Sequence, residues 1–289
     1  MSGVAYEIVD VFTDRPFAGN PLAVVYGGDD LATDQMHALA REFNLAETVF
    51  VLPPTDPAAT YRARIFTPEV ELPFAGHPSV GAAVTSMRRG LFPPGEVVQE
   101  CGAGLLPITV ESGRATVTSG APRLGPPLDP APLLELAGLT ADDHAEGAPR
   151  SAGGGLDWVF LPVRRQALAG VRIDGPAAER AGITDLCVFS WSATAGEAHS
   201  RVFVPGTAVP EDPATGSAAL GLGLWLVATG LLPGEGTSAY RVHQGHEMKR
   251  PSLLECTVTA SGGVATRATV GGHVCPVARG EIIVPPFIG

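Results

Sequence analysis

Lysine is almost missing from this 289-residue chain: Lys249 is the only one, and 19 basic residues stand against 30 acidic ones. The formal net charge of −11 excludes the basic face that nucleic acid or an anionic membrane would require. Charged residues make up 17% of the chain and aromatic residues 6%, against a usual charged share of about 25%. Small aliphatic side chains must therefore do most of the packing.

Cysteine is also scarce, and no Cys-x-x-Cys pair occurs among Cys101, Cys187, Cys256 and Cys275. This pattern indicates a reducing cytoplasm, and no secretory signal is visible in the first thirty residues. His243 and His246 form a His-x-x-His pair, but no third ligand follows at a helical or hairpin spacing. We therefore expect no metal.

One uncharged run, residues 214–234, is long enough to cross a bilayer, but it contains five glycines and has a proline near its end. We interpret it as a helix buried in a protein core. Glycine (36) and proline (27) are abundant elsewhere, which predicts many turns between short strands. The phosphate-binding loop and the dinucleotide fingerprint are both missing.

An internal repeat organises the chain. Residues 64–83 (RIFTPEVELPFAGHPSVGAA) are similar to residues 201–220 (RVFVPGTAVPEDPATGSAAL) at offsets of 137 and then 135. The simplest explanation is two domains of similar fold; chance similarity between two turns rich in glycine and proline is the alternative. We predict a first domain over residues 1–121, a second over 122–279, and the return of 280–289 to the first.

Each repeat contains a strand, a proline-rich loop and a run of small apolar residues, at 79–87 and 217–228. A helix that is apolar on all sides is surrounded by protein. We therefore predict an α+β fold of two pseudo-symmetric domains, each a β-barrel or roll wrapped around a central apolar helix. Because proline favours the first helical position, His77 and Asp212, which precede Pro78 and Pro213, are the expected N-caps.

Two similar domains create a cleft, and small-molecule sites prefer such interfaces. If both helix starts face it, their unpaired N–H groups form a pocket for a substrate carboxylate. The predicted substrate contacts lie in these two turns: Gly76, Ser79, Gly216 and Ser217.

The acid/base candidates beside these turns are Glu47, His77 and Asp212. Glu47 opens an apolar strand, where a side chain can point into a cleft, although the residues alone favour an ordinary solvated carboxylate at a strand end. His77 could instead be a helix cap or a buried, hydrogen-bonded imidazole. Helix capping alone would account for Asp212.

Five blocks of the chain resemble the phenazine biosynthesis PhzF-like family: residues 9–25, 44–51, 66–83, 211–219 and 244–252. They include ELPFAGHP and EDPATGSA, and they fall in register over essentially the whole chain. The resemblance implies the diaminopimelate epimerase-like fold and a cofactor-independent isomerase. It also implies a homodimer whose active site lies between the domains.

Carried over by position, the resemblance makes Glu47 the acid/base residue and places His77, Asp212 and Ser217 in the active site. Related racemases use two opposed thiols, but neither helix start has a cysteine here. Lys249 departs from the family pattern, which more often has glycine at that position, and a bulky cation there could change ligand choice or the dimer surface.

The sequence therefore predicts a cytoplasmic isomerase that shifts a proton between carbons of a small cyclic or unsaturated amino or hydroxy acid. Two alternatives stay open. One is an epimerase or racemase with unlike bases on opposite faces. The other is a non-catalytic protein that binds small acids with the same fold.

Overall fold

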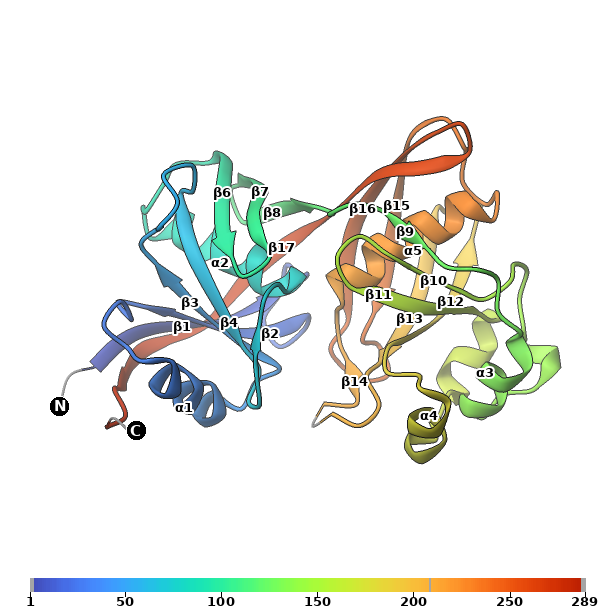
Figure 1. Ribbon diagram of the computed structural model, residues 1–289, viewed down its shortest axis with the longest axis horizontal. Coiled ribbons are helices and arrows are strands. Elements are labelled where there is room, and N and C mark those ends of the chain that lie inside the picture. Colours follow the sequence, from blue (N-terminus) through green and yellow to red (C-terminus); the bar gives the residue numbers. More distant parts are fainter. Residues whose placement is uncertain (1–2, 208, 287–289) are drawn as a thin grey trace. The chain divides into compact units, whose positions relative to one another are not determined.

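The computed structural model describes residues 3–207 and 209–286, and it divides into two compact units (Figure 1). Unit 1 is Met1–Thr118 with Gly271–Gly289, and unit 2 is Ser119–Val270. The chain returns to unit 1 at Gly271, earlier than the predicted residue 280. The reason is β17 (Val264–Ile283), one long strand whose Val274 already pairs with Val11 of unit 1.

Unit 1 is a closed barrel of eight strands. Its pairing order is β1–β2–β3–β4–β6–β7–β8–β17 and back to β1. The strands are β1 (Gly3–Val11), β2 (Asn20–Tyr26), β3 (Glu47–Leu52), β4 (Tyr61–Phe66), β5 (Glu71–Leu72), β6 (Gly95–Cys101), β7 (Gly104–Glu111) and β8 (Arg114–Thr118). The short β5 pairs with β4 outside this ring. The β2–β3 and β4–β6 pairs are parallel.

Helix α2 (Gly76–Arg88) fills this barrel, and all its residues from Gly76 to Ser86 are buried (Figure 1). Its small side chains let the surrounding strands approach closely. A Cβ atom on Gly81 would lie 2.4 Å from the Leu22 side chain and 3.0 Å from that of Val11. Helix α1 (Thr33–Phe43) packs elsewhere in unit 1, with Met36 and Leu39 in a cluster that includes Phe50.

Unit 2 repeats the same order of strands around a second helix. Its elements are β9 (Arg123–Leu124), α3 (Pro130–Leu136), η1 (Ala141–Asp143), β10 (Arg150–Gly153), β11 (Asp157–Pro162), η2 (Arg165–Gly170), α4 (Gly175–Ala181), β12 (Leu186–Ser192), β13 (Glu197–Phe203), β14 (Glu211–Asp212), α5 (Gly216–Ala228), β15 (Gly236–Gln244) and β16 (Ser252–Ser261). The β11–β12 and β13–β15 pairs are parallel, as their counterparts are in unit 1. This agreement makes a true internal repeat the explanation rather than chance.

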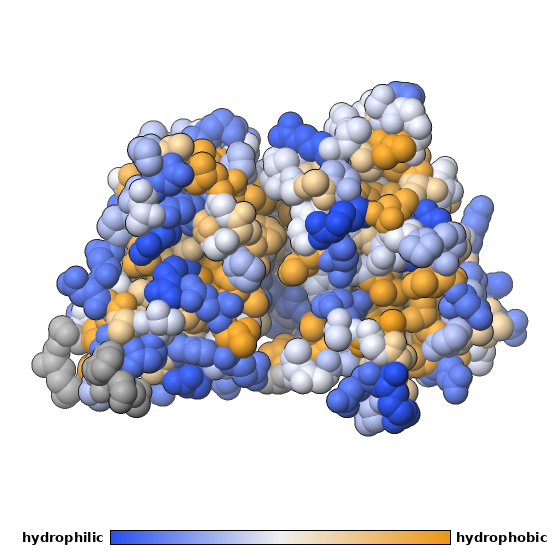
Figure 2. All heavy atoms as spheres, in the orientation of Figure 1, coloured by the Kyte–Doolittle hydropathy of each residue, from blue (hydrophilic) through white to orange (hydrophobic). Residues whose placement is uncertain are grey.

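The run interpreted as a buried helix forms α5, which is buried from Gly216 to Val227 inside unit 2. No helix among residues 3–207 and 209–286 is both long and apolar enough to span a membrane. Apolar and hydrophilic side chains alternate over the face of each unit shown in Figure 2. Scattered exposed apolar residues of this kind are normal for a folded chain.

The predicted offset of 137 holds for β4 and β13, because Phe66 and Phe203 pair with the equivalent residues Glu71 and Glu211, but the segments that follow are displaced. Helices α2 and α5 start at Gly76 and Gly216, an offset of 140, after the paired strands β5 and β14. Each repeat also carries an arginine that holds the first residue of its short strand: Arg64 binds Glu71 and Arg201 binds Glu211. Matching the prolines in the sequence therefore misplaced the short strands and helices by three to five residues, because the loop between β4 and β5 is shorter than the loop between β13 and β14.

The predicted N-caps are wrong. The N-cap residues are Ala75 and Thr215, so His77 is the second residue of α2 and Asp212 lies three residues before the cap of α5. Neither Pro78 nor Pro213 occupies the first helical position, which in both helices is a glycine. His77 is consequently buried in the interior of unit 1 and does not cap the helix.

Candidate active site

Glu47 and His77 lie side by side in unit 1. Glu47 is the first residue of β3 and pairs with Leu22 of β2, while His77 stands in the first turn of α2. The Oε2 atom of Glu47 is 3.4 Å from Nε2 of His77. The His77 side chain is 5% exposed and the Glu47 side chain 18%, and Oε2 of Glu47 is itself buried. The contact between the two groups is therefore shielded from water, with Glu47 the more accessible side chain.

Burial lowers the pKa of His77 from 6.5 to about 3, against the opposing effect of a hydrogen bond to the Pro21 carbonyl. The ring is therefore neutral at neutral pH, and its contact with Glu47 is not an ion pair of two full charges. Nδ2 of Asn20 lies 3.3 Å from Nδ1 of the ring. The contacts with Asn20 and Pro21 fix the orientation of the imidazole and so determine which ring nitrogen meets Glu47. A neutral imidazole offers one hydrogen-bond donor and one acceptor.

Ser79 belongs to a buried hydrogen-bond chain inside unit 1. Its Oγ donates to the Ala75 carbonyl at 2.9 Å and accepts from Nε2 of Gln99 at 2.9 Å. Oε1 of Gln99 in turn accepts from the Tyr61 hydroxyl at 2.9 Å. The Ser79 side chain thus fixes the start of α2 from within. The predicted substrate contact at this turn fits Gly76 better, since the first amides of a helix have no intrahelical acceptor.

Asp212 holds the turn that leads into α5 in unit 2. Its Oδ2 accepts from Oγ1 of Thr215 at 2.6 Å, and its carbonyl accepts from Nε2 of Gln244 at 2.7 Å. Oε1 of Gln244 accepts the Thr215 N–H at 3.2 Å. This network fixes the backbone immediately before Gly216.

Ser217 follows in the first turn of α5, where its Oγ accepts a hydrogen bond from Nε1 of Trp158 at 3.0 Å. The indole only donates, so the hydroxyl keeps its own proton for another acceptor. Ser217 is therefore suited to donate to a ligand at this helix start.

The structure thus brings together Glu47, His77 and Gly76 in unit 1, and Asp212, Gly216 and Ser217 in unit 2. That the two sets act on one substrate stays a prediction.

Residue patterns missed the polar side chains that hold these groups: Asn20, Tyr61, Gln99, Trp158, Thr215 and Gln244. Asn20, Thr215 and Gln244 stand in blocks that carry the family resemblance, which was the one signal available for them.

A cavity of about 370 Å³ in unit 1 lies away from this pair. Its lining includes Tyr26, Leu52 and Arg89, which stand at the ends of β2, β3 and α2 opposite to Glu47 and His77. It is therefore not part of the candidate site.

Comparison with known proteins supports an isomerase. The model of a family described as phenazine biosynthesis-like protein matches residues 9–280. The chain is similar to an uncharacterized isomerase of Mesorhizobium japonicum, at 37% identity over 96% of this chain and 98% of that protein. It is also similar to the trans-2,3-dihydro-3-hydroxyanthranilate isomerase of Pseudomonas aeruginosa, at 32% identity over 96% and 98%.

Two solved structures show the fold. A PhzF-family phenazine biosynthesis protein of Bacillus anthracis has a TM-score of 0.86 at 23% identity, covering 98% of this chain and 100% of that one. A hydroxyproline epimerase of Agrobacterium vitis has a TM-score of 0.67 at 14% identity, covering 98% and 91%. The predicted α+β fold shared with such epimerases is confirmed.

Proposed function

Because this chain belongs to the phenazine biosynthesis-like family and is an isomerase, we propose that it shifts a proton between two carbons of a small cyclic or unsaturated amino or hydroxy acid. Glu47 acts as base and then as acid, without a cofactor. One carboxyl group suffices when it takes the proton from one carbon and returns it to another. The relative from Pseudomonas aeruginosa, which is named for an isomerisation of dihydrohydroxyanthranilate, suggests the substrate class.

The observation that carries this proposal is the pairing of Glu47 with a buried, neutral His77 at 3.4 Å. A neutral imidazole does not fix the carboxylate in its charged form as a cation would, so Glu47 can gain and lose a proton during turnover. The first amides of α2, beside His77, have no acceptor within the helix and suit the substrate carboxylate. His77 thus orients Glu47, and Gly76 lets the ligand approach the backbone.

The test is proton NMR of the full-length protein in D₂O with small unsaturated and cyclic amino and hydroxy acids, including trans-2,3-dihydro-3-hydroxyanthranilate. We expect rearrangement or deuterium incorporation in one compound. Glu47→Gln should slow it by about 10²- to 10⁴-fold, the usual contribution of general acid/base catalysis. Glu42→Gln is the matched control, because Glu42 is an exposed glutamate of α1 in the same unit.

A Glu47→Gln variant with wild-type turnover on a true substrate would remove Glu47 from the mechanism. Saturable binding of these acids without rearrangement or exchange would favour the non-catalytic alternative. The predicted roles of Asp212 and Ser217 are tested separately: Asp212→Asn should reduce turnover while the chain stays folded by circular dichroism. The expected homodimer stays a prediction, which sedimentation of the purified protein would test.

Epimerisation is the second candidate function, because the fold is shared with a hydroxyproline epimerase. It needs a second base on the opposite face of the substrate, and neither helix start offers a thiol for this. Chiral chromatography of the product separates the two reactions, since a positional isomer and an epimer elute differently.

A further inference from the structure

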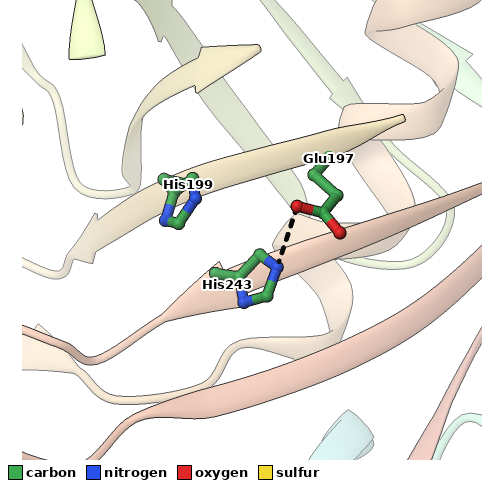
Figure 3. A group of neighbouring side chains, drawn as sticks. All are labelled: Glu197, His199 and His243. Carbon is green, nitrogen blue, oxygen red and sulfur yellow. Dashed lines mark ion pairs between the residues drawn. The ribbon is translucent and has the colours of Figure 1, made fainter. Parts of the chain in front are cut away.

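A cluster of metal-ligating side chains lies on unit 2, where β13 and β15 run parallel (Figure 3). His199 of β13 stands directly opposite His243 of β15, and Glu197 is two residues before His199 on the same face. One ligand atom from each of the three lies within 4.8 Å of the others. The two imidazole rings are stacked, with centroids 4.7 Å apart and planes inclined by 16°.

The cluster faces away from the core of unit 2. Along β13 and β15, the buried residues Ala198 and Val242 alternate with the ligand candidates, which are only partly buried. Successive side chains of a strand point to opposite faces. The cluster therefore stands on the outer face of the strands, where an ion can enter from solvent.

The internal repeat supplies an informative contrast. In unit 1 the equivalent position of the parallel pair β4–β6 holds Arg62 opposite Glu100. Opposite charges attract across neighbouring strands, whereas like side chains such as two imidazoles have no such complementarity. Glu197 has such a partner, because it stands opposite Arg241 and its Oε1 is 3.0 Å from Nη2 of that arginine, which leaves Oε2 towards His243. An ordinary cross-strand contact does not explain why His199 faces His243.

The hydrogen bonding of the cluster is also incomplete. Nε2 of His243 is buried, and among the residues that the structure describes it has no hydrogen-bond partner. Its nearest acidic group is Oε2 of Glu197, at 3.4 Å. A buried nitrogen without a hydrogen bond is costly, and coordination of a cation would satisfy it together with the carboxylate.

We propose that Glu197, His199 and His243 bind a divalent transition-metal ion, for which zinc is the best fit. Imidazole and carboxylate are zinc ligands with bonds of about 2.0–2.2 Å, so two ligand atoms of a tetrahedral site are about 3.4 Å apart. The His243–Glu197 separation of 3.4 Å already meets this requirement. His199 closes the site through rotation of its side chain.

Two further groups determine how tightly the ion is held. The ring of His246 lies 6.0 Å from that of His199 and 6.3 Å from that of His243, so His246 or a water molecule supplies the fourth ligand. Arg165 opposes binding, because its Nη2 is 3.2 Å from Nδ1 of His199. The Arg165 side chain is exposed and can turn into solvent.

The test is titration of the chelator-treated, full-length protein with Zn²⁺ by isothermal calorimetry, and with Co²⁺ by visible absorption, which reports the coordination geometry. We expect one ion per chain, with tetrahedral Co²⁺ bands that Zn²⁺ abolishes. His199→Ala and His243→Ala should each weaken binding at least about 10- to 100-fold, the usual effect of disturbing a metal site. Arg165→Ala should tighten it.

The matched control is His273→Ala, because His273 is an exposed histidine of unit 1, and this variant should bind as the wild type does. Circular dichroism verifies that each variant is folded, and Glu197→Gln serves if an alanine variant is not. The proposal is overturned if the wild type does not bind Zn²⁺, or if binding survives in the His199→Ala/His243→Ala double variant. A Co²⁺ spectrum with thiolate bands would likewise overturn it, by assigning the ion to cysteine.

Discussion

The buried, neutral state of His77 makes a quantitative prediction about stability in acid. The pKa of His77 is about 3 in the folded protein, against 6.5 for an ordinary histidine. Between these two values the unfolded chain binds a proton that the folded chain does not. Folding stability must therefore fall as the pH decreases from about 6.5 towards 3, and His77 imposes no such loss at neutral pH.

The size of the effect follows from the shift. One pKa unit corresponds to about 1.4 kcal/mol, so at pH 5, which is 1.5 units below the ordinary value, His77 should cost about 2 kcal/mol of unfolding free energy. The full shift of 3.5 units would cost about 5 kcal/mol near pH 3, where carboxyl groups titrate as well. The interval from pH 7 to pH 5 is therefore the cleaner one.

The perturbation is His77→Gln, which keeps a polar side chain but cannot titrate. All three tryptophans, Trp158, Trp191 and Trp225, lie in unit 2, so tryptophan fluorescence would not report on unit 1. Amide hydrogen exchange of the α2 and β3 peptides gives the opening free energy of unit 1 directly. The quantity to compare is the change between pH 7 and pH 5, corrected for the intrinsic exchange rate.

The wild type should lose about 2 kcal/mol more than His77→Gln over this interval. His273→Gln, which replaces an exposed histidine of unit 1, should behave as the wild type. Parallel pH dependence in the wild type and His77→Gln, within about 0.5 kcal/mol, would mean that His77 is not held neutral by burial. The account of the Glu47–His77 pair would then fail with it.

Four further substitutions test the packing and backbone conformation of the two units by chemical denaturation. Arg201→Met should lower the unfolding free energy by about 3–5 kcal/mol, because it breaks a bidentate pair with Glu211 whose arginine is only 6% exposed. The equivalent Arg64→Met should lower it by at most about 1 kcal/mol, since the Arg64–Glu71 pair is solvated. Equal costs would refute the burial argument. Gly81→Ala should lose about 1–3 kcal/mol, since its Cβ would meet Leu22 at 2.4 Å; an unchanged denaturation midpoint would contradict this packing. Lys249→Gly should be neutral or gain up to about 1 kcal/mol, because Lys249 has a φ of 59°, and a clear loss would show that the lysine side chain makes a stabilising contact.

The left-handed backbone at Lys249 also gives the departure from the family pattern a physical meaning. The resemblance leads us to expect glycine there, and glycine adopts positive φ at little cost. The exposed lysine of this chain stands in a turn that the Lys249 N–H closes on the His246 carbonyl at 3.1 Å. The sequence identified Lys249 as the unusual residue. Its positive φ shows that the lysine also carries a conformational cost, in addition to its charge.

The amino-acid sequence by itself determined the elements whose buried environment follows directly from their residue composition. The runs 79–87 and 217–228 have no polar face, so they could only be helices inside protein, and the similarity of residues 64–83 to 201–220 required two related units. Both conclusions need only local residues and their spacing. The same holds for the family, because its blocks are contiguous stretches of the chain.

The tertiary structure alone decided which distant side chains meet. The register of the repeat depended on loop lengths that proline matching could not detect. The pKa of His77 depends on burial by surrounding strands, and the third ligand near His243 comes from β13, about 45 residues away in the chain. Strand pairing and burial are long-range properties, so no motif search along the chain could have shown them.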